Sequence, residues 1–170
     1  MSEYQFGGYQ RERIAIEAFF LARWVEFTEG WAEQVSVAMD GQAFDLQDAS
    51  GNPIFNRIRL TIKSGAVLQG SIGRTLNRID HIGTLTATIY TEGGKGSATW
   101  RRYAEQLQDM LHGVSIEDDG QIARTTEAVF LRFSPPQLAP NEHPYIAADF
   151  DDPPYHITNV VAPFVRYGFR

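Results

Sequence analysis

Hydrophobic and polar positions follow two different periods along this chain of 170 residues, and each period predicts one kind of element. The clearest helical period falls between residues 98 and 112. Ser97 precedes it and Gly113 follows it, and both residue types are typical of helix ends. A helix is therefore predicted over 98–112, with its apolar face formed by Trp100, Tyr103, Ala104, Leu107, Met110 and Leu111.

A second helix is predicted over residues 9–31, with a break near Gly30, and it carries two apolar stripes. The first stripe consists of Ile14, Ala18, Leu21 and Val25, and the second of Phe20, Trp24, Phe27 and Trp31. A surface helix normally has one apolar stripe, which faces the core. Two stripes predict burial on two sides, one against a sheet and the other against a neighbouring subunit or a long loop of the same chain.

Alternation with a period of two predicts strands over 55–63 and 80–90. In the first strand Ile58, Leu60 and Ile62 point one way, whereas Arg57, Arg59, Thr61 and Lys63 point the other way. Weaker strand signals lie at 35–48, 67–72, 114–116, 127–133 and 155–166. The pattern predicts one α+β domain over residues 1–170, with a mainly antiparallel or mixed sheet packed against two principal helices.

Residues 134–154 form a segment of different composition. It contains six of the eight prolines, and its charges are all acidic: Glu142, Asp149, Asp151 and Asp152. Proline disfavours helices and central strands. Tyr145, Ile146 and Phe150 are unlike a purely solvated tail, so this segment is predicted to be an extended proline-rich arm that packs on something.

Composition excludes several classes of function. The chain has no cysteine, which excludes disulfides, thiolate catalysis and cysteine-ligated zinc. The net charge of −6 disfavours nonspecific binding to nucleic acid through a basic surface. No apolar run reaches the roughly 20 residues that a membrane span needs. The first residues lack the pattern of a secretion signal. We therefore expect a cytoplasmic protein with no membrane partner.

The loop Gly93–Ser97 lies between a predicted strand and a predicted helix, where anions often bind. The phosphate-loop pattern fails, because Ile89 and Gly96 occupy positions that need glycine and a hydroxyl residue. The dinucleotide pattern fails at Thr99. The loop is predicted to be a structural turn whose Lys95 contacts a partner, and an anion site is the alternative.

No catalytic, cofactor-binding or metal-binding residue is singled out by the sequence. His81, His112, His143 and His156 are scattered and lack partners at metal-ligand spacing. The acidic run at 149–152 lacks the glycine and the final glutamate of a calcium loop. We expect a protein that is not an enzyme and that uses no cofactor.

Several segments in order resemble tail terminator proteins of long-tailed bacteriophages. The resemblance begins at Arg57-Ile-Arg-Leu-Thr-Ile62 and continues through Gly70-Ser-Ile-Gly73, Ile82-Gly-Thr-Leu-Thr-Ala-Thr-Ile-Tyr90, Gly93-Gly-Lys-Gly96 and the helix at Ala98. The closing Tyr155-His-Ile-Thr-Asn-Val-Val-Ala-Pro-Phe164 and the leading helix are also similar. Together these segments cover about two-thirds of the chain, and their order carries the resemblance.

The resemblance implies a structural virion protein that assembles as a homo-hexameric ring in the host cytoplasm. In that family the ring caps the head-proximal end of the tail tube, stops tube polymerisation and joins the tail to head-side neck, stopper or connector proteins. DNA passes through the lumen without specific binding. The alternatives are another neck or tail-completion adaptor of the same fold, or a small anion- or nucleotide-binding α+β domain that uses the Gly93–Ser97 loop.

Nine residues are the expected interface candidates. They are the second helix stripe, two arginines of the exposed strand face, the lysine of the glycine loop and two aromatic residues of the arm: Phe20, Trp24, Phe27, Trp31, Arg57, Arg59, Lys95, Tyr145 and Phe150. For the aromatic residues the alternative is an ordinary core, and for the arginines it is a solvated face.

Overall fold

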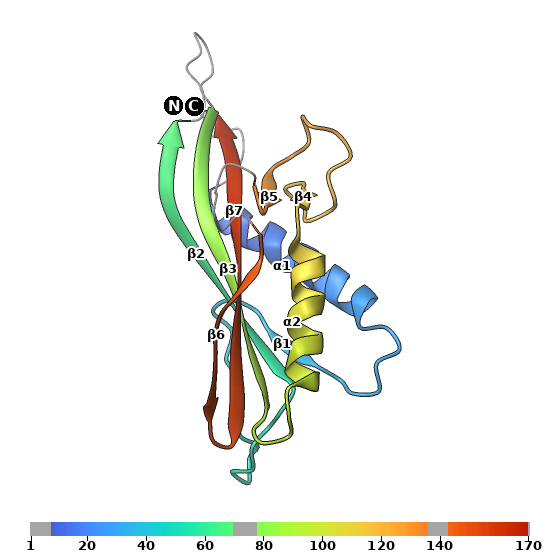
Figure 1. Cartoon of the computed structure of the whole chain (residues 1–170). Coiled ribbons are helices and arrows are strands. Elements are labelled where there is room, and N and C mark those ends of the chain that lie inside the picture. Colours follow the sequence, from blue (N-terminus) through green and yellow to red (C-terminus); the bar gives the residue numbers. More distant parts are fainter. Residues whose placement is uncertain (1–7, 70–77, 136–142, 170) are drawn as a thin grey trace.

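The computed structural model describes residues 8–69, 78–135 and 143–169. The elements in chain order are α1 (Tyr9–Phe27), β1 (Ser36–Ala38), β2 (Arg57–Gln69), β3 (Arg78–Glu92), α2 (Ala98–Leu111), β4 (Ser115–Ile116), β5 (Leu131–Phe133), β6 (Tyr145–Asp152) and β7 (Tyr155–Phe169) (Figure 1). The predicted α+β class with two helices is confirmed.

The seven strands form one mixed sheet. The order across the sheet is β1-β2-β3-β7-β5-β4, and β6 also pairs with β7. Only the β1–β2 pair is parallel among the described pairs, and the others are antiparallel. Strand β7 pairs with β3 along its whole length, whereas on its other side it meets β6 through residues 155–161 and β5 through residues 164–166.

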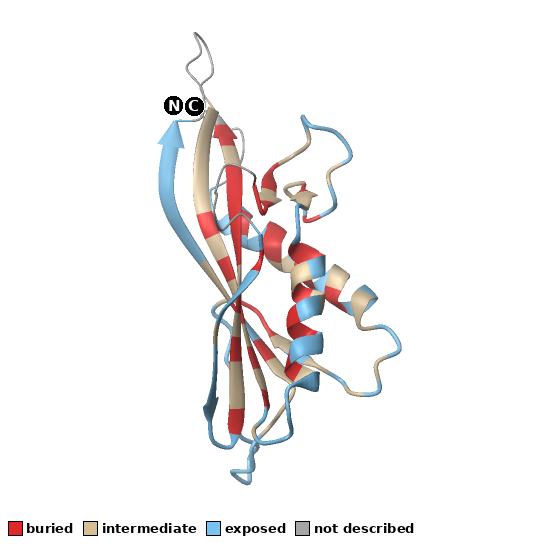
Figure 2. Cartoon of the chain, viewed as in Figure 1, coloured by how far each residue is buried: buried red, intermediate tan, exposed pale blue. Residues whose placement is uncertain are grey.

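Both helices lie against the same face of the sheet, and the core is between them and the strands (Figures 1 and 2). The alternation of the strands explains this arrangement, because Ile58 and Leu60 of β2 and Leu85, Ala87 and Ile89 of β3 all point to that face and are buried. The helices contribute Ile16, Phe19 and Phe20 from α1 and Tyr103, Leu107 and Met110 from α2.

The other face of the sheet is partly open. Thr84, Thr86 and Thr88 lie on this face and are half-buried, in agreement with the predicted alternation. A long connection between β1 and β2 folds over one end of the face. There Phe44 contacts the Tyr90 ring at 5.1 Å between centroids, and the Tyr155 hydroxyl donates a hydrogen bond to the Leu46 carbonyl.

Several boundaries differ from the sequence prediction. Helix α1 ends at Phe27 and not at 31, and the Thr28 amide and hydroxyl both bond the Trp24 carbonyl at this end. The weak strand predicted over 35–48 is only the three-residue β1. The strand predicted at 67–72 is the continuation of β2 to Gln69 after a bulge between Ser64 and Val67, and residues 70–72 lie outside the described residues.

The proline-rich arm contains a strand that the sequence analysis did not predict. Residues 145–152 form β6, which folds back on β7 through a turn at Pro153–Pro154. The arm therefore packs on the terminal strand of its own chain. Residues 136–142 of the predicted arm lie outside the described part.

Candidate interaction surface

The aromatic stripe of α1 belongs to the core of the single chain. Phe20 and Trp24 are buried, and Phe27 and Trp31 pack against the core cluster. Trp31 stacks on Tyr103 of α2 at 5.4 Å between ring centroids. The stripe therefore joins α1 to α2, and the prediction that Phe20 and Trp24 form a subunit interface is wrong, because the chain buries both of them itself.

The other stripe of α1 faces outward. Ile14, Leu21 and Val25 are 51%, 47% and 68% exposed. Aromatic residues have more apolar area to bury than aliphatic residues, which explains why the helix turns its aromatic stripe inward. Both predicted apolar stripes are present, and the stripe that is exposed is not the one predicted for external contact.

The two predicted arginines of β2 have different environments. Arg57 is half-buried, donates to the Asp45 carbonyl, and lies 4.7 Å from the Phe44 ring centroid. It therefore fixes the β1–β2 connection. Arg59 is exposed on the open face, and Lys63 is exposed on the same face further along β2. These two cations are available to a partner.

One side of β2 forms a free sheet edge in the described structure. Strand β1 pairs only with residues 57–59, and the Asp40 carboxylate accepts a bond from the Ile62 amide. Beyond this point, residues 63–69 are all exposed and have no described strand beside them on the side away from β3 (Figure 2). This edge carries two exposed apolar side chains, Val67 and Leu68.

Strand β6 forms the free edge on the opposite side of the sheet. In the described structure β6 pairs with β7 alone, and all but one of its residues are exposed (Figure 2). The exposed residues include the predicted Tyr145 and Phe150, together with Ile146. The charges of the strand are Asp149, Asp151 and Asp152, so this edge is acidic where the β2 face is basic.

Free edges of this kind are sites for pairing with another chain. Unpaired amides and carbonyls form a template for an added strand, and monomeric proteins usually protect such edges with lysine, proline or bulges. Here the bulge in β2 and Lys63 give partial protection, but both edges still expose large apolar side chains. The arrangement can therefore bind a strand at either side of the sheet.

The glycine loop positions Lys95 beside carboxylates. Lys95 Nζ lies 3.8 Å from Glu92 Oε1, and Arg102 pairs with Glu33 across the same hollow of about 330 Å³. The Gly93 amide donates to the Pro154 carbonyl at 2.8 Å, so the loop packs on the β6–β7 turn. Because both cations are already paired with acids, this hollow is a poor anion site.

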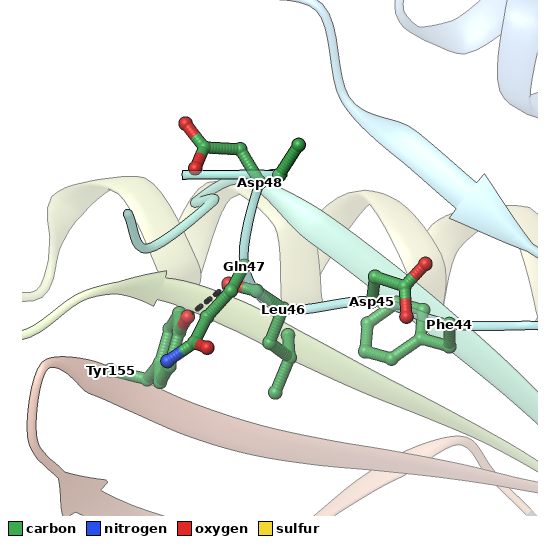
Figure 3. Close-up of a pocket in the computed structure, with 7 residues that line it drawn as sticks. Phe44, Asp45, Leu46, Gln47, Asp48 and Tyr155 are labelled. Carbon is green, nitrogen blue, oxygen red and sulfur yellow. Dashed lines mark hydrogen bonds between the residues drawn. The ribbon is translucent and has the colours of Figure 1, made fainter. Parts of the chain in front are cut away.

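A larger hollow of about 770 Å³ lies between Tyr155 and residues 44–49 (Figure 3). Its Asp48 carboxylate accepts bonds from the amides of Ser50 and Asn52 and from the Asn52 side chain. The Asn52 contacts, led by the side-chain bond, lower the Asp48 pKa below its ordinary value. The Asp48 carboxylate therefore closes the turn at residues 48–52.

A buried ion pair was missed by the sequence analysis. Arg166 Nε donates to Glu12 Oε2 at 2.8 Å, and Ser64 Oγ donates to Glu12 Oε1 at 2.6 Å. Glu12 is 1% exposed and Arg166 is 3% exposed. Only a weak signal in the sequence indicates this pair. Glu12 lies about one helical turn before Ala15 and Ile16, and so on the side of α1 that is buried. The pair ties α1 to β7.

The part of the chain that the structure describes offers neither a metal site nor a membrane-spanning helix. No group of three or more His, Asp or Glu side chains gathers there at metal-binding distance. Neither α1 nor α2 is long and apolar enough to cross a membrane.

Comparisons with known proteins support the fold alone. No family model matches the chain, and no curated protein matches it. A solved protein structure whose name states no function has a similar fold, with a TM-score of 0.57 and 13% sequence identity. The match covers 89% of this chain and 93% of that chain, so the likeness extends over nearly the whole α+β domain.

Proposed function

We propose that this protein is a structural virion protein that assembles into a ring, most closely comparable to a phage tail terminator. In this proposal a homo-hexamer caps the head-proximal end of the tail tube, ends its polymerisation and joins it to a head-side neck protein. The observation that carries the proposal is the pair of free edges on opposite sides of one sheet. Two different, complementary edges on each copy allow head-to-tail association, which gives a ring when the rotation between successive copies closes.

The strand directions support continuous pairing between copies. Strand β6 is antiparallel to β7, and β2 runs in the same direction as β7 because both are antiparallel to β3. Strand β6 of one copy would therefore lie antiparallel to β2 of the next copy when a rotation about an axis roughly along the strands relates them. The alternation of strand directions then continues across the contact.

The side chains of the two edges also match face by face. On the open face, Leu68 and Lys63 of β2 would meet Tyr145, Phe150 and Asp152 of β6. On the helix face, the same register places Val67 opposite Asp149, with Ile146 as its diagonal neighbour. Apolar contact and an opposite-charge pair across strands each favour pairing. The exposed apolar residues of the sheet thus lie on the two edges, β2 and β6, at which neighbouring copies in the proposed ring would pair.

The charge of the assembly is compatible with DNA passage. Six copies at −6 each carry −36, and an acidic ring repels the phosphate backbone. DNA would pass through such a lumen without specific binding.

Charge reversal at the two edges tests the proposal. We expect Lys63→Glu to abolish the rings seen by electron microscopy of the purified protein mixed with tail tubes. Adding Asp152→Lys should restore them, because the opposite charges are then exchanged between the edges. Arg101→Glu is the control, since Arg101 is exposed on α2, outside both edges, and its reversal should leave the rings unchanged.

Two outcomes would count against the ring. One is a clean monomer by light scattering at every concentration, with no ring on the ends of added tubes. The other is a ring that forms equally well with Lys63→Glu. A ring that binds head-side proteins but not the tube would instead favour a neck or tail-completion adaptor of the same fold.

A further inference from the structure

The first turn of α1 is fastened to the sheet by polar and aromatic side chains. Glu12 forms the buried pair with Arg166 of β7 and also accepts the hydrogen bond from Ser64 of β2. The Tyr9 ring lies edge-on to the His81 ring at 6.2 Å between centroids, and Arg166 Cζ lies 5.6 Å from the centroid of the Tyr9 ring. These five residues are called the α1 cluster.

Little else in the described structure holds this turn. The N-cap residue Gly8 makes no side-chain cap, Tyr9 is 55% exposed, and the buried apolar residues of α1 begin only at Ala15. Arg11 pairs with Asp118 at an exposed site, where ion pairs contribute little to stability. Opening of the turn would therefore expose little apolar surface, as is typical of a segment that opens locally while the rest of the protein stays folded.

His81 lies in an environment that disfavours its positive charge. Its register partner on β7 is Arg166, and its Nδ1 atom is buried without a hydrogen-bond partner among the described residues. Glu12 and Asp80 place negative charge near the ring, but Glu12 also pairs with Arg166, and Asp80 pairs with Arg78. Burial, and then the Arg166 charge, lower the pKa of His81 below its ordinary value.

We propose that the α1 cluster is a pH-sensitive switch that releases the first turn of α1 from the sheet on acidification. A proton on His81 places a second positive charge beside Arg166, and the one carboxylate of Glu12 then faces both cations. While the turn is docked, the added Nδ1–H also lacks an acceptor among the described residues, whereas an open turn lets water reach it. Strand β2 contributes Ser64 and Val67 here, and neither side chain titrates between pH 5 and 8.

The direction of the switch follows from the pKa of His81 in the docked and open forms. In the open form His81 is hydrated and titrates near its ordinary value of about 6.5, whereas in the docked form its pKa is lower. The open form therefore binds more protons. Docking is fully stable above about pH 6.5 and weakens as the pH falls through that value towards the docked pKa. The switch acts within one copy, so it does not depend on the proposed ring.

Hydrogen–deuterium exchange of the purified protein at pH 7.5 and 5.0 tests the switch. Protection factors remove the intrinsic effect of pH on the exchange rate. We expect the protection of amides 12–16 to fall at least about threefold at pH 5.0. Addition of about 1 M urea should leave this exchange almost unchanged, because a local opening exposes little surface, whereas exchange in α2 through global unfolding should accelerate.

Three variants identify the group that responds to pH. His81→Gln cannot take up the proton and should give equal protection of amides 12–16 at both pH values. Tyr9→Ala removes the ring that covers His81 from α1, so the turn should open more often at pH 7.5 and respond less to acid. Gln10→Ala, a change of an exposed residue in the same turn, should keep the wild-type response.

Several results would overturn the switch. One is wild-type protection of amides 12–16 that is equal at the two pH values. Another is a pH response that persists in His81→Gln, which would assign the response to a different group, and a full wild-type response in Tyr9→Ala would also contradict the proposal. The last is exchange of this turn that accelerates with urea as much as exchange in α2 does, because the opening would then be global.

Discussion

Glu12 Oε2 and Arg166 Nε lie 2.8 Å apart, although the two residues are 154 positions apart in the sequence, and both residues are buried. Removing two charges from water costs several kcal/mol per ion, which the mutual attraction and the bond from Ser64 offset. No residue near Glu12 or Arg166 in the sequence indicates that these two side chains form a pair. Sequence reasoning could identify the buried face of α1 but not this partner on β7.

We expect Glu12→Gln to lower the free energy of unfolding by about 3 kcal/mol, because it removes the carboxylate charge that pairs with the buried Arg166 guanidinium. Urea unfolding followed by circular dichroism would measure the loss. The control is Glu26→Gln, which breaks an exposed pair with Arg23 and should cost less than about 0.5 kcal/mol. Equal losses for the two variants would show that the buried pair contributes no more to the free energy of unfolding than the exposed pair does.

His81 should make stability depend on pH. Burial, and then the nearby Arg166 charge, lower the pKa of His81 below its ordinary value. The unfolded chain therefore binds more protons at this site than the folded chain does. Stability is fully present above about pH 6.5 and decreases as the pH falls through that value towards the folded pKa.

The measurement compares urea midpoints of wild type and His81→Gln at pH 7.5 and 5.5. We expect the wild type to lose more stability than the variant between these two values. Gln34→Ala, which changes an exposed residue without an ionisable group, is the control and should keep the wild-type dependence. A wild type that becomes relatively more stable than His81→Gln on acidification would contradict the sign of the pKa shift.

At the scale of elements, the sequence predicted the position and ends of an element best where one local pattern determines both. Helix α2 was predicted within one residue, because a single apolar stripe and Gly113 at φ 64° define its face and its end. Helix α1 was located, but the stripe that is exposed is not the one predicted for external contact, since two stripes of similar length cannot be ranked by spacing. Strand β6 was missed because prolines surround it, and its pairing with β7 comes from the following turn.

Gly83 shows how closely two central elements approach each other. A Cβ atom at this position in β3 would lie 2.3 Å from Phe164 Cζ and 2.8 Å from the Lys63 carbonyl oxygen. We expect Gly83→Ala to lower the free energy of unfolding by about 1–3 kcal/mol through this overpacking. Thermal or urea unfolding would measure the loss.

A double-mutant cycle identifies the cause. Phe164→Leu removes the ring atoms that the methyl group added by Gly83→Ala would strike, so the double variant should be less destabilised than the two single losses added together. The rescue should be partial, because the Lys63 carbonyl remains in place. Strict additivity would mean that the cost at Gly83 arises elsewhere in the backbone.

At the scale of the whole molecule, the candidate surface depends on which strands end the sheet. Sequence alternation placed Arg59 and Lys63 on an open face, and the structure confirms that face. It could not show that β2 and β6 are the two edges, because strand order arises from pairing between residues far apart in the chain. The sequence therefore found Tyr145 and Phe150 as candidates from their chemistry, and the topology explains why they are exposed.

Two electrostatic effects act in opposite directions when copies associate. Each copy carries −6, so copies repel one another at long range, whereas Lys63 and Asp152 attract across the proposed contact. At about 0.15 M salt the Debye length is already about 8 Å, so most of the long-range repulsion is screened, and further salt weakens mainly the short-range attraction. We therefore expect association, measured by analytical ultracentrifugation, to weaken several-fold between about 0.15 and 0.5 M salt. Lys63→Met should flatten this dependence, and association that strengthens with salt would show that net repulsion, not edge complementarity, controls assembly.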